Sequence, residues 1–224
     1  MRRRPPDPRT VVRGLERAYG PRPWKTWGPP LEELVATILS QNTTGRNANA
    51  ALRGLRRALP RWDAVADAPL GRLASAIRPA GLHRQKAKHI RAALRAIRRD
   101  RGRTSLAFLR RWPTQRIREY LGALPGVGPK TAACVLLFSL RRPVLPVDTH
   151  VHRVSRRLGL LGPRTTAEQA HEVLGALVPG RLVYAFHVLL IEHGRRTCRA
   201  RRPACGVCAL ARVCPSARRQ GRGG

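Results

Sequence analysis

Apolar residues recur along most of this chain at the spacing of an amphipathic helix. In residues 31–40 they stand at positions 31, 34, 35, 38 and 39, which places them on one helical face. The same pattern predicts further helices near residues 10–19, 45–58, 69–77, 84–99, 114–122, 129–140, 149–158, 166–177 and 181–193. No alternating pattern of useful strand length occurs, so we predict an all-α fold.

The stretch from residue 124 to residue 130 predicts a tight turn that opens a helix. Gly126 and Gly128 permit positive φ, and Pro129 suits the first helical position, where no amide donor is required. Backbone amides at such a helix start have no intrahelical partner and can bind a phosphate. Residues 131–140 are apolar on nearly every side. We therefore expect a buried helix whose first turn is rigidly held.

Lys130, at the start of this helix, has two interpretations. A lysine on a helix is usually solvated. This chain, however, has only four lysines among its 45 basic residues, so arginine is its usual positive charge. A lysine amine can lose its proton, whereas an arginine cannot, and a neutral amine can attack carbon and form a Schiff base. We predict that Lys130 is a nucleophile whose position is fixed by the rigid first turn of this helix.

Asp148 also has two interpretations, and they are compatible. It precedes the helix predicted for residues 149–158 and could accept that helix's first amides as an N-cap. The apolar run at residues 143–147 suggests a low-dielectric wall beside it. A carboxylate held there could stabilise developing positive charge in a reaction.

The net charge of the chain limits the classes of partner that it is expected to bind. A net charge of +33 over 224 residues implies a polyanionic partner, either nucleic acid or an acidic membrane. The sequence has no run of eighteen apolar residues and no apolar signal-peptide core near its start, so we expect no membrane and an intracellular location. The length is sufficient to bury a sizeable core.

Four of the five cysteines are clustered near the C-terminus. They follow the spacing Cys198-x6-Cys205-x2-Cys208-x5-Cys214. Cys134 lies in the apolar helix, and we predict that it is a small core residue. Clustered cysteines in an intracellular chain indicate a metal site in preference to disulfides. The spacing alone leaves a zinc site and an iron–sulfur cluster equally open.

Two of these motifs together resemble the helix-hairpin-helix DNA glycosylases, and most closely their endonuclease III branch. The matching stretches are Leu124–Ala132 and Val147–His150. In that branch a hairpin lysine is the nucleophile and an aspartate 18 residues later is its partner, the interval that separates Lys130 from Asp148 here. The cysteine spacing is also that of the branch's [4Fe-4S] loop.

The resemblance implies two all-α domains. Residues 32–142 would form a six-helix central domain that carries the hairpin. Residues 143–224 would form a cluster domain, with the [4Fe-4S] loop at residues 198–214 and a basic tail after it. The N-terminal segment, residues 1–31, would pack with this cluster domain.

The partner implied by the resemblance is double-stranded DNA with a damaged base or an abasic site, lying across the cleft between the domains. Gln41 and Asn42 match the polar insertion that fills the gap left by an extruded base, and Leu82 matches the apolar one. Each could equally be an ordinary helix-end or turn residue. The DNA-binding residues implied in this way are Gln41, Asn42, Leu82, Gly126, Val127, Gly128 and His150.

The implied reaction is base excision followed by strand cleavage. Neutral Lys130 would attack the sugar C1′ as the damaged base departs, and Asp148 would stabilise the cationic transition state or take the lysine proton. A Schiff base would follow and permit β-elimination. Oxidised pyrimidines are the default substrates of the family, but Asn42 and Gly45 replace the usual Gln and Asp of the branch, which leaves the lesion open.

Two other classes of function remain. A monofunctional adenine or mismatch glycosylase of the same fold would not need the lysine, and Thr37 stands where the adenine-specific branch has a glutamate. Hairpins and cysteine clusters also occur in proteins that only bind DNA, although Lys130 and Asp148 at the matching interval argue against that class. We expect a monomeric, nucleoid-associated repair enzyme.

Overall fold

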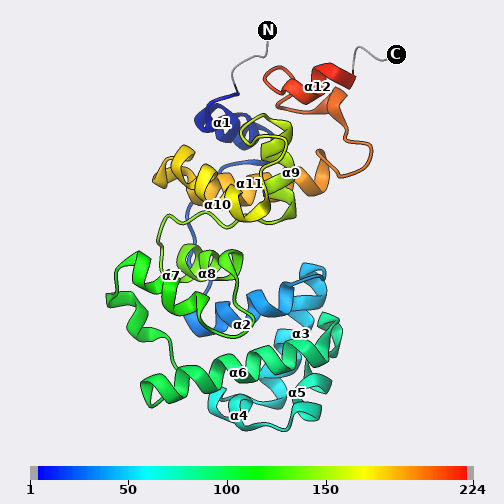
Figure 1. Cartoon of the computed structure of the whole chain (residues 1–224). Coiled ribbons are helices and arrows are strands. Elements are labelled where there is room, and N and C mark those ends of the chain that lie inside the picture. Colours follow the sequence, from blue (N-terminus) through cyan, green and yellow to red (C-terminus); the bar gives the residue numbers. More distant parts are fainter. Residues whose placement is uncertain (1–4, 221–224) are drawn as a thin grey trace. The chain divides into compact units, whose positions relative to one another are not determined.

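The structure, a computed structural model, describes residues 5–220 and is helical (Figure 1). No strand occurs among these residues, so the predicted all-α class is confirmed for them. The chain forms two compact units. The hairpin unit is Thr26–Arg142, and the cysteine unit joins the N-terminal segment up to Lys25 with the chain from Pro143 onward. The first boundary follows residue 25, whereas the resemblance implied one after residue 31.

The hairpin unit is built around α6 (His83–Arg101), which packs against α2, α4 and α5. The side chains of Ile90, Leu94 and Ile97 on α6 are fully buried, and burial of each such side chain stabilises the fold by about 1.5–3 kcal/mol. The other elements of the unit are α2 (Pro30–Ser40), α3 (Gly45–Ala58), α4 (Trp62–Asp67), α5 (Leu70–Ala76), η1 (Arg78–Ala80), η2 (Ala107–Arg111), α7 (Thr114–Gly122), α8 (Pro129–Cys134) and η3 (Val135–Ser139).

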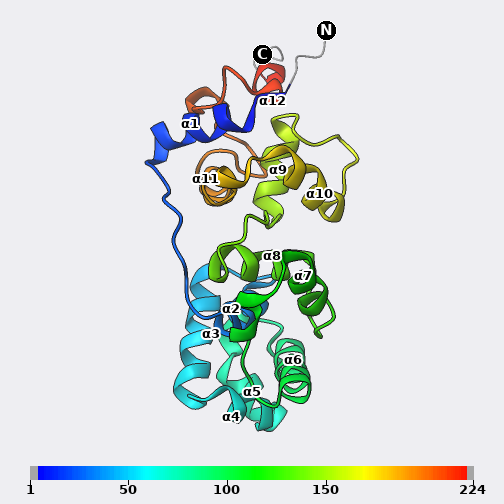
Figure 2. The ribbon, with the colours of Figure 1, turned by 90° about the vertical axis from the view of Figure 1, so that its left-hand side faces the viewer.

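The cysteine unit brings the two ends of the chain together. Helix α1 (Pro8–Tyr19) lies beside α11 (Val183–Arg196), as Figure 2 shows. The Tyr19 hydroxyl is 2.9 Å from His193 Nδ1, and the Trp24 ring stacks on Tyr184. The remaining elements are α9 (Thr149–Arg157), which also packs on α11, α10 (Ala167–Leu177), η4 (Gly180–Leu182), η5 (Cys205–Val207) and α12 (Pro215–Gln220).

The buried helix predicted for residues 129–140 has two parts. Helix α8 is followed directly by η3, a π-helical turn in which the Leu140 amide donates to the Val135 carbonyl at 3.2 Å. Every residue from 131 to 139 is buried. A stretch that is apolar on all sides gives no phase from which this change of pitch could be predicted. Short π segments frequently occur at functional sites.

Length and apolarity decide whether a helix could span a bilayer. Within the described residues no single helix meets both requirements, and only α10 with Gly180–Arg196 meets them together, as a pair bent by 116°.

Helix α3 passes so close to the end of α5 that Gly54 has no room for a side chain. A Cβ at Gly54 would lie 2.7 Å from the carbonyl oxygen of Ala76, whereas a Cβ at Gly71, in α5, would meet nothing within 4 Å. Alanine is the better helix former by about 1 kcal/mol. We nevertheless expect Gly54→Ala to lower the melting temperature and Gly71→Ala to leave it unchanged or raise it. Calorimetry of both variants tests this, and an unchanged or higher value for Gly54→Ala would contradict the packing.

Candidate active site and cysteine cavity

The predicted hairpin turn is present and lies directly on helix α6. Gly126 has φ +77°, and a Cβ there would lie 2.6 Å from the His89 side chain, so both the backbone angle and the contact require glycine. The Val127 amide donates to the Leu124 carbonyl at 3.1 Å. Of the two glycines expected to allow positive φ only Gly126 uses it, since Gly128 has φ −97°.

Lys130 is the second residue of α8. Gly128 is the N-cap in extended conformation, its carbonyl accepts the Ala132 amide at 3.1 Å, and no side chain caps this helix. The lysine is half-buried. It therefore stands on the first turn of a buried helix, next to amides that lack the usual capping side chain.

Glu33 is an acidic residue near Lys130 that the sequence analysis does not identify. It lies on α2, which packs against α8, and is only 8% exposed. The Thr37 hydroxyl donates to its Oε1 at 3.1 Å. Burial raises the pKa of Glu33 to about 7, although the Thr37 hydrogen bond and the charge of Lys130 both act to lower it. A buried carboxyl group thus lies within electrostatic range of the candidate nucleophile.

The two loops matched to DNA insertion both contain a residue with left-handed backbone. Asn42 has φ +50° and Leu82 has φ +45°, a conformation that asparagine adopts fairly readily but that is strained for leucine. Leu82 is apolar yet 55% exposed. Gln41 donates from Nε2 to the Gly126 carbonyl at 3.3 Å and to Thr131 Oγ1 at 3.4 Å, which ties the first loop to the hairpin.

Asp148, in the cysteine unit, is the N-cap of α9. Its Oδ1 accepts the amides of His150 at 2.9 Å and Val151 at 2.7 Å. The capping role considered for Asp148 is therefore present. The geometry within the cysteine unit also leaves room for the catalytic role, because these capping bonds use one carboxylate oxygen.

Two histidines hold the loop that leads into Asp148. His187 Nδ1 is 2.8 Å from the Pro146 carbonyl, and His171 Nδ1 is 3.1 Å from the Leu145 carbonyl. Because a carbonyl can only accept, each of these ring nitrogens carries a hydrogen. The loop is thereby fixed at consecutive carbonyls just before the carboxylate.

His150 is half-buried where α9 packs on α11. Burial lowers its pKa most, Asp148 opposes this effect, and Arg153 adds to it. Arg153 Nη2 lies 3.2 Å from His150 Nδ1, and a Cβ at Gly194 would lie 2.9 Å from the same nitrogen. Packing within the cysteine unit thus occupies one edge of the imidazole, and its contact with DNA stays a prediction.

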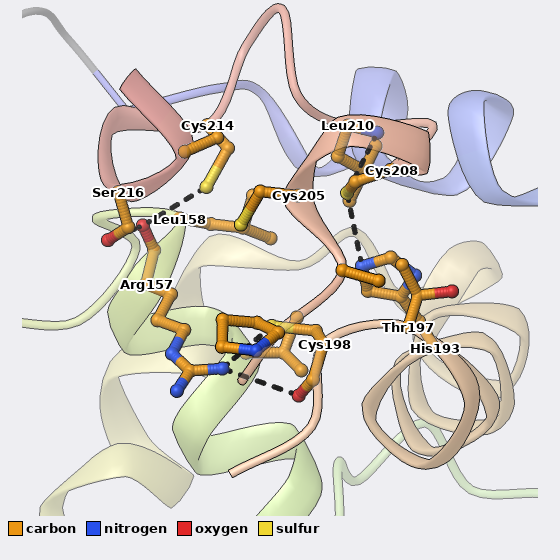
Figure 3. A pocket seen from close by; sticks show the side chains of 14 residues that line it. Arg157, Leu158, His193, Thr197, Cys198, Cys205, Cys208, Leu210, Cys214 and Ser216 are labelled. Atoms are coloured by element: carbon orange, nitrogen blue, oxygen red, sulfur yellow. Dashed lines mark hydrogen bonds between the residues drawn. The ribbon is translucent and has the colours of Figure 1, made fainter. Parts of the chain in front are cut away.

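The four clustered cysteines lie around one cavity of about 30 Å³ (Figure 3). Cys198 follows α11, Cys205 begins η5, Cys208 follows η5, and Cys214 precedes α12. Within residues 5–220, no three Cys, His, Asp or Glu side chains are close enough to hold a single metal ion. The four thiols that share the cavity are nevertheless the donor type that both a zinc site and an iron–sulfur cluster require.

Hydrogen-bond donors approach the sulfurs in this cavity. Arg157 Nη1 donates to Cys198 Sγ at 3.2 Å, and the Leu210 amide donates to Cys208 Sγ at 3.4 Å. Burial raises the pKa of the Cys205 thiol, and the charges of Cys214 and Cys198 raise it further. A bound cation would favour the thiolate form of Cys205 against this effect, and thiolates are the form in which cysteines bind metals.

Comparisons with known proteins identify the family of this chain. A family profile described as "HhH-GPD superfamily base excision DNA repair protein" matches residues 35–179. A protein of Arabidopsis thaliana assigned as a DNA glycosylase is 36% identical over 165 residues, which are 74% of this chain and 56% of the plant protein. Endonuclease III of Thermotoga maritima is 37% identical over 194 residues, 87% of this chain and 86% of that enzyme.

Comparison of the fold with solved structures also identifies endonuclease III. The solved structure of a trapped covalent intermediate between endonuclease III and DNA has a TM-score of 0.82 to this chain at 29% identity. That similarity covers 96% of this chain and 97% of the other. A non-covalent complex of endonuclease III with DNA has a TM-score of 0.81.

The buried Glu33 predicts pH-dependent stability. Because its pKa is raised from 4.5 to about 7 in the folded state, the folded protein retains a proton that the unfolded chain has lost between these pH values. Folding stability should therefore fall as the pH rises through this window, by at most about 1.4 kcal/mol per unit. Glu33→Gln should raise the melting temperature at pH 8 but hardly at pH 5.

The neighbouring Glu32, which is partly exposed, supplies the matched control. Glu32→Gln should shift the melting temperature little at either pH. A Glu33→Gln effect of equal size at pH 5 and pH 8 would show that the carboxyl does not titrate in this range.

Proposed function

The chain belongs to the HhH-GPD superfamily of base excision DNA repair proteins, and from this premise we propose that it acts as an endonuclease III-type DNA glycosylase that also cleaves the strand. The observation that carries the proposal is Lys130 at the start of α8, directly after a glycine turn on α6. A relative with the same fold forms a covalent intermediate with DNA. Formation of a covalent intermediate requires a nucleophile that is held in a fixed position.

Lys130 is proposed to attack C1′ of the damaged nucleotide. The neutral amine forms the N–C1′ bond while the bond from C1′ to the base breaks, and the base leaves with the electron pair. Opening of the sugar ring gives a protonated Schiff base, which acidifies the C2′ proton. Loss of that proton expels the 3′ phosphate, so the strand is cut by β-elimination, and water then releases the lysine.

Asp148 is proposed to stabilise the positive charge that develops on the sugar, or to take the lysine proton. The two amides on Oδ1 fix the direction of the carboxylate, and the histidine-held loop before it limits its movement. Capping and catalysis are then two uses of one carboxylate.

The DNA contacts are proposed for both units. Amides of residues 126–128 would bind a backbone phosphate, while Gln41, Asn42 and Leu82 would occupy the space left by the flipped nucleotide. The net charge of +33 supports a polyanionic partner. In this proposal Thr26–Arg142 is the hairpin domain, His150 contacts DNA from the other unit, and duplexes with oxidised pyrimidines or abasic sites are the substrates.

We infer that Cys198, Cys205, Cys208 and Cys214 hold a [4Fe-4S] cluster, because their side chains line one cavity and their spacing matches the cluster loop of the endonuclease III branch. Leu210 is the one buried residue between Cys198 and Cys214 in the described structure. A loop with so little apolar burial depends on metal ligation for its fold. When bound, the cluster would therefore supply structural cross-links.

The first test concerns the nucleophile. Lys130→Gln should still bind abasic duplex DNA but form no covalent adduct when borohydride is added, because the amine that forms the imine is absent. Lys88→Gln, at an exposed lysine on α6, is the matched control and should be trapped at wild-type yield. Adduct formation by Lys130→Gln at wild-type yield would contradict the proposal.

The second test separates the two roles of Asp148. Asn caps a helix about as well as Asp, so Asp148→Asn should leave the melting temperature and DNA affinity almost unchanged. Single-turnover base release should nevertheless slow by about 10² or more, the usual scale for a positioned catalytic group. Release at the wild-type rate would reduce Asp148 to a cap.

The third test concerns the cluster. Protein purified without oxygen should contain about four iron atoms per chain and absorb broadly in the visible range. Cys205→Ser should lose iron and make the chain after residue 197 sensitive to proteases, whereas Cys134→Ser should keep its iron. Stoichiometric zinc without iron in the wild-type protein would overturn the assignment.

A further inference from the structure

Lys86 is a buried charge in the hairpin unit that the proposed reaction does not use. It lies in the first turn of α6 and is only 2% exposed, although lysine is almost never fully buried without partners. Its Nζ donates to three backbone carbonyls, those of Leu39 at 2.8 Å, Gln41 at 2.6 Å and Ala80 at 2.8 Å. All three hydrogens of the ammonium group are therefore used.

These carbonyls belong to the two loops matched to DNA insertion. Gln41 immediately precedes Asn42, and Leu39 lies in the last turn of α2. Ala80 ends η1, two residues before Leu82. One side chain thus joins two loops that are about forty residues apart in sequence.

The backbone of Lys86 reinforces the second loop. Its amide donates to the Leu82 carbonyl at 3.0 Å, so Lys86 binds the chain on both sides of Gly81. Burial lowers the pKa of the Lys86 ammonium, while only the protonated form has the three hydrogens that can bind all three carbonyls at once. The group is placed to act as a fixed cross-link between the loops.

The residues next to this cross-link have left-handed backbone. Asn42 and Leu82 have φ +50° and +45°; asparagine adopts this region fairly readily, but in leucine it persists only where the surroundings enforce it. Leu82 also exposes 55% of its surface, so burial of its own side chain does not hold it in place. The Lys86 ammonium connects the two loops that contain these left-handed residues.

We propose that Lys86 is a positioning residue that holds the Asn42 and Leu82 loops in the conformation required to enter the DNA stack. The inference rests on the proposed function and assigns this role to a side chain that touches neither substrate nor nucleophile. A compact ammonium with three donors directed to three carbonyls suits the site, whereas the planar fork of arginine does not. The loops are held in advance, so no ordering is required when the base is flipped.

The test compares a reaction that needs base flipping with one that does not. Lys86→Met should lower the single-turnover rate of base release from a damaged duplex by about tenfold or more, because the inserted residues no longer replace the lost stacking. Borohydride trapping by the same variant on a single-stranded abasic oligonucleotide should stay within about twofold of wild type. Lys88→Met removes the same charge from the same helix and should match wild type on both substrates.

A merely structural role would give a different result. Equal losses on both substrates together with a lower melting temperature, or no loss on the duplex, would overturn the inference. If Lys86→Met does not fold, Lys86→Arg keeps a cation and hydrogen-bond donors in the site, and it should show the same difference between substrates. Wild-type protein that traps neither substrate would overturn the proposed function, and this inference with it.

Discussion

The candidate active site depends on a contact between the hairpin and helix α6 that only glycine permits. Gly126 has a positive φ, and an added Cβ would lie 2.6 Å from the His89 side chain. Any larger residue would therefore push the turn away from α6. This position fixes the start of α8 and therefore Lys130. It also fixes the Gly126 carbonyl to which Gln41 donates. Helix α6 thus positions both Lys130, the proposed nucleophile, and the Gln41 loop that is proposed to enter the DNA.

The four lysines show how charge type is used in an arginine-rich chain. Lys25 and Lys88 are exposed, where arginine would serve equally well. Lys86 occupies a site formed by three backbone carbonyls. Lys130 places an amine at the start of α8, directly after the hairpin turn. Under the proposed roles, arginine would be unsuitable at these two positions for different physical reasons, its planar geometry at Lys86 and its permanent charge at Lys130.

Strong local patterns made much of the fold predictable. The helices at residues 45–58 and 114–122 were predicted with the bounds observed, because each has a clear apolar face. Helix α4 has six residues, too few to show a period. The cysteine spacing predicted a metal site, and the structure brings the four cysteines around one cavity. The helical pattern after Asp148 predicted its role as the N-cap of α9.

The remaining features depend on tertiary contacts that the sequence does not display. Nothing local distinguishes Glu33 from Glu32, yet only Glu33 faces the interior. Lys86 resembles any solvated helix lysine until the three carbonyls are assembled around it. The shift of the first boundary to residue 25 has a similar cause, since the Trp27 ring stacks on Phe138 at 3.8 Å and its amide donates to the Phe138 carbonyl. Residues 1–4 and 221–224, which include the end of the predicted basic tail, lie outside the described residues.

The central claim is that one specific amine attacks DNA, and the most direct measurement identifies that amine in the unmodified protein. The wild-type protein is incubated with abasic duplex DNA, reduced with borohydride and digested, and the modified peptide is sequenced by tandem mass spectrometry. The account predicts a single modified residue, Lys130. Modification of Lys88, Lys25 or the N-terminal amine in place of Lys130 would contradict it.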